Sequence, residues 1–429
     1  MERYNEYKDS GVYFIPDIPN SWQVLKAKYL FKQEKREVRP EDEIVTCFRD
    51  GQVTLRKNRR TEGFTNSMKE IGYQGVRKGD LVIHNMDAFA GAIGVSDSDG
   101  KGTPVYACCT PKRNDINQYY YCYLLRYLAR NGFILSLAKG IRERSTDFRF
   151  NDFKELYLPV PSKEEQDAIV SYIDLQSTKI DEAIAQQQKM IDLLNERKQI
   201  IINNAVTKGL NPDAPMKDSG VDYIGLIPEH WVVRRMASLG VFSKGGGISR
   251  DNLLEEGEPA ILYGDIYTKY NYFAEDIKNH VSKKVALASV EVHKNELLMT
   301  GSGETKEDIG KTIVFLGNKA YAGGDVIIFK QDNNNSSFLS YALNSSYAKN
   351  FRYKESKGEI VVHIYANAVR QLYLALPDIT EQNSIVEYLN NKVGIIDSEI
   401  CVVRKQISLL QERKQIIIND VVTGKVKVL

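Results

Sequence analysis

Two glycine-containing segments in the second half of the chain have residue types that could bind a phosphate or a cofactor. Gly310-Lys311-Thr312 ends like a phosphate-binding loop, but Thr305 stands where the first glycine of that motif belongs. The β-branched residues that follow favour a strand, whereas the motif requires a helix. Gly301-Ser302-Gly303 lacks the third glycine of a dinucleotide-binding fingerprint. Neither segment therefore predicts a nucleotide cofactor.

The other reactive side chains show no arrangement typical of a catalytic centre. The five histidines and five cysteines have neither the spacing of metal ligands nor that of a disulfide framework, which favours buried neutral thiols. The Asn/Asp-Pro-Pro-Tyr/Phe tetrapeptide of an adenine methyltransferase is missing. Pro16-Asp17 and Pro377-Asp378 are not followed by the Glu-x-Lys of a nuclease core. We therefore expect a protein that is not an enzyme and binds no cofactor or metal, with a dispersed active site as the remaining catalytic alternative.

Positive charge is concentrated in the first part of the chain. The formal net charge is only +2, but residues 20–157 contain 24 Lys and Arg against 17 Asp and Glu, whereas residues 222–377 contain 18 of each. The densest basic clusters are Arg56, Lys57, Arg59 and Arg60, and Arg142 with Arg144. Such clusters are typical of phosphate contacts, although a solvated charged face has the same composition.

No segment of the sequence predicts a membrane span or an export signal. No apolar run reaches the roughly 18 residues that a membrane helix needs. The chain begins Met1-Glu2-Arg3-Tyr4, without the hydrophobic stretch of a signal peptide. With 429 residues, of which 42% are hydrophobic, the chain can bury at least two cores. We expect a cytoplasmic multidomain protein.

The chain contains an internal repeat. Residues 165–207 align without a gap with residues 381–423, at an offset of 216 positions. A shorter repeat relates residues 9–22 to residues 218–231 and includes a tryptophan in each copy, Trp22 and Trp231. The stretches between these repeats share little beyond composition. The pattern predicts two half-chains that have a common frame and carry different inserts.

Each long repeat is predicted to form one helix. Residues 163–208 contain neither glycine nor proline, and apolar residues recur with heptad spacing in both copies. These residues are Ile169, Ile173, Ile180, Ile184, Ile191, Leu194, Ile201 and Ala205, and then Ile385, Leu389, Ile396, Ile400, Ile407, Leu410, Ile417 and Val421. Ser162 and Thr380 are suitable N-caps, and Gly209 and Gly424 follow the last turns. We expect the two helices to pair antiparallel within the chain, although the heptads alone also allow a coiled coil between chains.

The two inserts are predicted to be mixed α/β domains. Strands are expected at residues 81–84, 91–95 and 105–108 in the first insert, and at 261–263, 311–316 and 326–329 in the second. Helices are expected at 118–136 and 338–347. Each insert ends in a strand-like run closed by a proline, at residues 156–159 and 372–377. Each insert is therefore expected to be a separate globular domain.

In combination, these motifs resemble the specificity subunit of type I restriction-modification enzymes. Each insert is introduced by Ile-Pro-x-x-Trp, at residues 18–22 and 227–231, and is closed by Pro-x-x-x-Glu-Gln-x-x-Ile-Val, at 161–170 and 377–386. A long helix ending in Glu-Arg-Lys-Gln-x-Ile-Ile follows each time. Segments 83–94 and 301–310 are similar to segments common in target-recognition domains. The resemblance covers nearly the whole chain; one departure is Pro159-Val160-Pro161 against Ala375-Leu376-Pro377.

The resemblance implies an α+β fold in which two mixed α/β target-recognition domains are separated by two long antiparallel coiled-coil helices with a pseudo-two-fold internal repeat. The expected boundaries are 1–160 and 211–377 for the domains, and 161–210 and 378–429 for the helices. It implies a DNA-binding subunit whose domains each read half of a bipartite target in double-stranded DNA. The helices would dock two methyltransferase subunits, and translocase/nuclease subunits would join for cleavage. AdoMet, Mg and ATP would belong to those partners.

Candidate DNA contacts lie in the basic clusters and in the motif-like loops. Phosphate contacts are expected of Arg56, Lys57, Arg59, Arg60, Lys306 and Lys311. Base contacts are expected of Asn85, Arg142, Arg144, Ser302 and Thr305. A coiled-coil scaffold with two protein-binding domains is the alternative. It explains the heptads, but not why the two inserts diverge so far within one frame.

Overall fold

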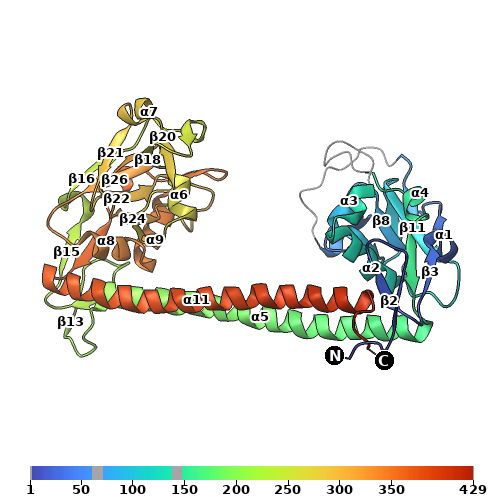
Figure 1. The fold of residues 1–429 in the computed structure, drawn as a ribbon. Helices are drawn as coiled ribbons and strands as arrows, with labels where there is room; N and C mark the ends of the chain where they lie inside the picture. The colour runs from blue at the N-terminus through green and yellow to red at the C-terminus, as the bar shows by residue number, and fades with distance from the viewer. Residues whose placement is uncertain (1, 60–70, 138–146, 429) are drawn as a thin grey trace. The chain divides into compact units, whose positions relative to one another are not determined.

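The computed structural model describes residues 2–59, 71–137 and 147–428. The chain divides into two compact units, one formed by residues 1–187 with 405–429 and the other by residues 188–404. Two long helices, α5 (Lys163–Lys208) and α11 (Ile379–Val422), each contribute one half to each unit (Figure 1). Each unit therefore combines one mixed α/β domain with two half-helices. Within the described residues, no helix is long and apolar enough to cross a membrane.

The domain of the first unit is built around a four-stranded antiparallel sheet of order β4-β11-β8-β9. Its strands are β1 (Tyr7–Asp9), β2 (Asp17–Pro19), β3 (Gln23–Lys26), β4 (Phe31–Glu34), β5 (Val45–Cys47), β6 (Val53–Leu55), β7 (Gln74–Val76), β8 (Leu81–His84), β9 (Ile93–Val95), β10 (Gly100–Gly102), β11 (Tyr106–Pro111) and β12 (Tyr157–Val160). Its helices are α1 (Ala27–Leu30), η1 (Arg56–Asn58), η2 (Ala88–Ala90), α2 (Gln118–Arg130), α3 (Phe133–Leu137) and α4 (Phe150–Phe153).

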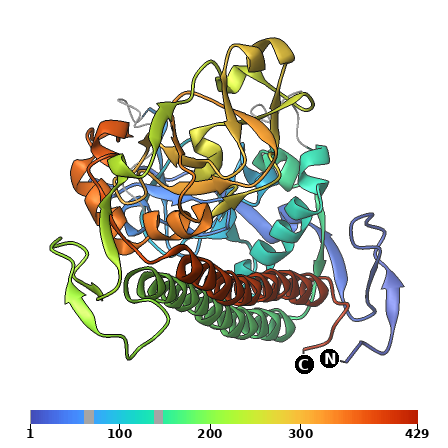
Figure 2. The same cartoon turned by 90° about the vertical axis from the view of Figure 1, so that its left-hand side faces the viewer.

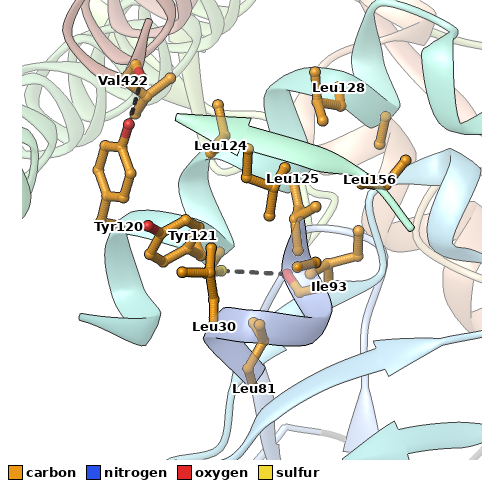
Figure 3. Packing of buried hydrophobic residues seen from close by; sticks show 14 of the residues in the cluster. Leu30, Leu81, Ile93, Tyr120, Tyr121, Leu124, Leu125, Leu128, Leu156 and Val422 are labelled. Atoms are coloured by element: carbon orange, nitrogen blue, oxygen red, sulfur yellow. Dashed lines mark hydrogen bonds between the residues drawn. The ribbon is translucent and has the colours of Figure 1, made fainter. Parts of the chain in front are cut away.

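Both faces of this sheet are buried, as the alternation along β8 shows. Leu81 and Ile83 point into a core shared with helix α2, while Val82 points into a second, smaller core under β5 and β6. This alternation follows from the two-residue period of a strand. The larger core continues to the end of α11, where the Tyr120 hydroxyl donates to the carbonyl of Val422 at 3.0 Å (Figure 3). The first domain is therefore packed directly onto the helix pair.

The domain of the second unit contains two five-stranded sheets, of order β16-β26-β22-β24-β19 and β17-β20-β18-β25-β21. Its strands are β13 (Met216–Asp218), β14 (Leu226–Pro228), β15 (Val232–Arg235), β16 (Val241–Lys244), β17 (Leu253–Leu254), β18 (Glu258–Ile261), β19 (Phe273–Ala274), β20 (Asn279–Val281), β21 (Val290–His293), β22 (Leu297–Thr300), β23 (Ser302–Gly303), β24 (Thr312–Phe315), β25 (Lys319–Ala322), β26 (Val326–Lys330), β27 (Val362–His363) and β28 (Tyr373–Leu376). Its helices are η4 (Met236–Ser238), η5 (Arg250–Asn252), α6 (Tyr263–Thr268), α7 (Lys283–Leu287), α8 (Ser336–Leu343), α9 (Ser346–Glu355) and α10 (Ala366–Val369).

The central strands of the two domains are arranged alike. In the first domain β8 lies between β11 and β9, and in the second β22 lies between β26 and β24, with antiparallel pairing throughout. The surroundings differ, because the second domain adds the parallel pairs β18–β25 and β19–β24. The inserts thus share a central motif that their sequences do not reveal.

The helices pair antiparallel inside each unit (Figure 2). In the first unit Lys414 forms an ion pair with Asp181 at 2.7 Å, and in the second Lys198 forms one with Asp397 at 2.6 Å. The offset of 216 residues relates these two pairs, so the repeat extends to contacts across the helix interface. Every predicted seam residue is buried or half-buried. The prediction of intramolecular antiparallel pairing is confirmed within each unit.

The main contacts that hold each domain to its helix are repeated. The buried indole of Trp22 donates from Nε1 to Glu165 Oε2 at 2.9 Å, and that of Trp231 donates to Glu381 Oε2 at 3.1 Å. The hairpins β1–β2 and β13–β14 have the same register, with Lys8 opposite Ile18 in the first copy. The Ile-Pro-x-x-Trp motif therefore fixes each domain at the start of a long helix.

The Glu-Gln pair of the closing motif reaches back into the insert. Gln166 Oε1 accepts from the backbone N–H of Asn117 at 2.8 Å, and Gln382 Oε1 accepts from that of Asn335 at 2.9 Å. In both copies the glutamine Nε2 donates at 3.0 Å to the carbonyl of the motif's proline. Asn117 and Asn335 are the N-caps of α2 and α8. The motif thus positions the first helix that follows the central sheet.

Four local predictions differ from the structure. Asp378, not Thr380, caps α11, because its Oδ1 accepts from the N–H of Glu381 at 2.8 Å. The predicted helix 118–136 is broken at Gly132, whose φ of +74° is left-handed. The single helix predicted at 338–347 covers the end of α8 and the start of α9, which are separated at Asn344. The strand predicted at 261–263 ends at Ile261, and α6 begins at Tyr263.

Candidate nucleic-acid interface

The two motif-like segments occupy equivalent positions in the two domains. Residues 85–92 connect β8 to β9, and residues 301–311 connect β22 to β24. Each segment therefore leaves the central strand and returns along its antiparallel neighbour. Loops at the end of a rigid sheet are where binding residues concentrate. Two segments chosen separately on sequence thus prove to be the same structural loop.

In the first domain, Asn85 is held by its backbone and has one unsatisfied side-chain atom. Its N–H donates to the carbonyl of Val105 at 2.9 Å, and its carbonyl accepts from the N–H of Phe148 at 3.0 Å. Its Oδ1 is buried without a hydrogen-bond partner among the described residues. The exposed guanidinium of Arg49 forms an ion pair with Asp87 of the same loop at 2.8 Å. The amide of Asn85 in this loop and the guanidinium of Arg49 beside it are both groups that can read base edges.

In the second domain, Ser302 is buried and belongs to a hydrogen-bond network. Its Oγ lies 2.8 Å from His363 Nδ1, and its carbonyl accepts from the Tyr267 hydroxyl at 3.2 Å. That hydroxyl accepts in turn from Thr300 Oγ1 at 2.7 Å. Burial raises the pKa of Tyr267 to about 12, so the phenol stays protonated. Ser302 is therefore placed to fix the loop, whereas Thr305 of the same loop is exposed.

A cavity of about 980 Å³ opens beside this loop. Glu304 and Thr305 lie on its loop side. The rest of the lining includes Arg250 of η5, Tyr263 of α6 and Lys269, which follows α6. Sequence reasoning missed these three residues together with Tyr267 and His363, because they lie 35 to 61 positions from the loop residues they approach and no motif marks them.

The cluster Arg56, Lys57 and Arg59 follows β6; the first two residues belong to η1, and Arg59 is its C-cap. Lys57 pairs with Glu43 at 2.5 Å, and Arg59 pairs with Asp50 at 2.7 Å while its guanidinium lies 4.2 Å from the centre of the Phe48 ring. Arg56 Nε donates to Thr46 Oγ1 at 3.3 Å. Exposed ion pairs contribute only about 0–1 kcal/mol, so a phosphate can replace their carboxylates at little cost.

The remaining predicted contacts have different surroundings. Lys306 is half-buried in the 301–311 loop. Lys311 is also half-buried, and its Nζ donates to the carbonyls of Tyr270 at 2.6 Å and Tyr267 at 3.2 Å. Arg60, Arg142 and Arg144 lie outside the described residues. Within the described residues there is no cluster of three or more His, Cys, Asp or Glu that could hold a metal ion.

The chain is similar to curated specificity subunits from Methanocaldococcus jannaschii. It is 24% identical to the putative type I restriction enzyme MjaX specificity subunit over an alignment of 443 positions, which covers 96% of each chain. It is also 24% identical to the type I restriction enzyme MjaVIII specificity subunit over 326 residues, which cover 74% of this chain and 72% of that one. No family model matches the chain.

Two solved structures share the fold. A chain from a structure that addresses complex assembly and conformational transition of the type I R-M system superposes with a TM-score of 0.70 at 14% identity, covering 95% of this chain and 99% of that one. The HsdS subunit from Thermoanaerobacter tengcongensis superposes with a TM-score of 0.51 at 15% identity, covering 95% and 98%. The likeness extends over the domains and both long helices, because it covers nearly all of this chain.

Proposed function

We propose that this chain, a homologue of type I restriction enzyme specificity subunits, is the subunit that gives such an enzyme its DNA sequence specificity. Residues 1–160 and 211–377 form the two target-recognition domains, and each reads one half of a bipartite site in double-stranded DNA. Residues 161–210 and 378–429 form the helices that dock two methyltransferase subunits. Translocase/nuclease subunits join this assembly for cleavage.

The observation that carries the proposal is a repeated frame around two unlike inserts. The contacts of Trp22 and Trp231 with the first helical turns recur almost unchanged, whereas the second insert has strands with no counterpart among the described residues of the first. A scaffold for one kind of partner gains nothing from that divergence. Two domains that recognise different half-sites need the same attachment to the helices and different recognition surfaces. A pseudo-two-fold frame also matches the approximate dyad of duplex DNA.

Within each domain the loop at the end of the central strand is the base-reading element. In the second domain Thr305 and the cavity beside it would meet base edges, while Ser302 and Tyr267 hold the loop in shape. In the first domain Asn85 lies in the corresponding loop. Basic side chains such as Arg59 and Lys306 contact phosphates and set the register of the domain on the duplex.

Catalysis belongs to the partners under this proposal. AdoMet would be bound by the methyltransferase subunits, and Mg and ATP by the translocase/nuclease subunits. The chain itself supplies recognition and docking, so transfer of a methyl group requires the assembled complex.

The proposal is tested by DNA binding with and without a type I methyltransferase subunit. A mobility-shift selection from a pool of random duplexes should enrich a bipartite sequence, and adding the methyltransferase should tighten the complex. Incubation with labelled AdoMet should give methyl transfer only when both subunits are present. A chain that enriches no sequence in either condition would instead be a protein scaffold, and transfer by the chain alone would make it an enzyme.

A further inference from the structure

A small cavity in the second unit is lined by four cationic side chains and one carboxylate. It has a volume of about 300 Å³ and lies where α5, α9 and the end of the 301–311 loop meet. The cations are Lys198, Lys311, Lys349 and Arg352, and the carboxylate is Asp308. Lys198 is already paired with Asp397 at 2.6 Å. Three cations therefore share a single carboxylate.

Arg352 is the most deeply buried of these cations. The residue is only 1% exposed, and its Nε donates to the carbonyl of Ile309 at 3.0 Å. Its Nη1 donates to the carbonyl of Leu343. A Cβ at position 310 would lie 2.4 Å from the Arg352 Cδ, so Gly310 with its φ of +74° lets the guanidinium pass. Two backbone carbonyls hold Arg352, but they do not neutralise its charge.

The cavity disfavours the charged form of these cations unless an anion is bound among them. Burial lowers the pKa of Arg352 to about 10. Burial also lowers the pKa of Lys311 and of Lys349. Asp308 raises both pKa values in part, and nearby cations lower them further, with Lys349 and Lys198 acting on Lys311 and Arg352 acting on Lys349. A buried charge without a partner costs several kcal/mol. A bound anion would remove that cost.

We propose that this cavity is a binding site for a phosphate group, held by Lys311, Lys349 and Arg352. The Arg352 guanidinium has five N–H donors, of which two bond to carbonyls, and the Lys311 ammonium has three, of which two bond to the carbonyls of Tyr267 and Tyr270. The donors that remain on these groups and on Lys349 can bond to phosphate oxygens. Charge-assisted bonds from Arg and Lys to phosphate oxygens are the strong class of hydrogen bond. Three cations against one carboxylate leave a positive excess that matches a phosphate better than a neutral ligand. The phosphate is either a free phosphate ion or a backbone phosphate of bound DNA.

Equilibrium dialysis of the full chain against labelled inorganic phosphate, at constant ionic strength set with chloride, tests the site. We expect saturable binding of one phosphate per chain. Lys349→Gln should bind roughly tenfold more weakly, since it removes one charge-assisted contact. Lys354→Gln removes the same charge from an exposed position of the same helix and should bind as the unchanged chain does. Lys349→Arg keeps the charge and should retain binding, which separates loss of charge from loss of fold.

Adding duplex DNA to the dialysis identifies the source of the phosphate. Release of the label by DNA would assign the site to a backbone phosphate, whereas simultaneous binding of both would assign it to a free phosphate. Absence of saturable phosphate binding, or equal binding by the Lys349→Gln and Lys354→Gln variants, would overturn the proposal. The measurement with phosphate alone does not depend on DNA recognition, so it stands even if the proposed function fails.

Discussion

At the scale of single residues, the basic cluster of the first domain gives a graded prediction. Arg59→Ala should weaken binding to all duplex sequences alike and lower the slope of log affinity against log salt by about one, because one phosphate contact is lost. The selected sequence should not change. Affinity measured over a salt series on two unrelated duplexes checks this. Lys179→Ala, an exposed lysine on α5, is the matched control and should leave DNA binding by the isolated chain unaltered.

Thr305 tests base reading in the second domain. Thr305→Val keeps the shape of the side chain and removes its hydroxyl. The binding free energy for the preferred target should weaken by about 1–3 kcal/mol, and one position of the target should accept other bases. Lys306→Ala in the same loop should weaken binding to all duplex sequences equally. Sequence selection with both variants measures the difference. If Thr305→Val lowers affinity without relaxing any position, Thr305 contacts the backbone and the two roles are exchanged.

Single residues were predictable where spacing marks them and not where the fold brings them together. The loops containing Asn85 and Thr305 follow from sequence motifs, and the structure gives them equivalent places beside the central strands. Tyr267, His363 and Arg352 belong to distant segments and contact the 301–311 loop only after folding. A sequence pattern cannot contain those contacts, because they depend on long-range pairing and not on local periodicity.

At the scale of elements, the frame contacts predict where each domain is held. Glu165→Ala leaves the buried Nε1 of Trp22 without its acceptor, and Glu381→Ala does the same to Trp231. Loss of the partner of a buried donor costs about 1–3 kcal/mol. Each variant should therefore lower the denaturant midpoint of its own unit only, which urea unfolding followed by hydrogen exchange can assign. Glu164→Ala, an exposed neighbour, should have a much smaller effect. Equal destabilisation of both units by either variant would mean that they unfold as one.

The long helices give a second prediction at this scale. Four residues inserted after Gln187 in α5, together with four after Arg404 in α11, should keep both ion pairs, Asp181–Lys414 and Lys198–Asp397, in register. Each helix would lengthen by about 6 Å. Because DNA rises about 3.4 Å per base pair, the unread spacer of the target should grow by one or two base pairs while both half-sites stay the same. Methylome mapping of a host that carries the variant would report the spacer. An unchanged spacer with retained activity would show that the helices do not set it.

Elements were predictable in proportion to their length and periodicity. The heptads gave both long helices and their buried seam, because a 3.5-residue period sustained over several turns has few other interpretations. The cap of α11 was mispredicted at Thr380, although the repeat itself equates Asp378 with Ser162. The sequence predicted one helix where the structure has two, α8 and α9. The chain turns between them at Asn344, whose side-chain amide bonds to Thr312 of β24. That break is caused by a tertiary contact.

At the scale of the whole molecule, we propose that two domains that read DNA independently share one frame. The inserts begin and end at equivalent frame contacts, so we expect the helices to accept another insert whose first helix keeps the contact with the glutamine of the closing motif. The repeat was evident in the sequence, whereas the common central strands of the inserts were not, because their residues diverged while their pairing did not.

The most direct test of this claim is the exchange of residues 23–155 for the matching insert of a related specificity subunit, followed by methylome mapping in a host that supplies the methyltransferase. Trp22 and Glu165 lie outside the exchanged segment, so the frame contact of the first domain is retained. We predict that one half of the methylated bipartite site changes to that of the donor while the other half stays as it was. A hybrid that remains active but alters both halves, or neither, would contradict the account.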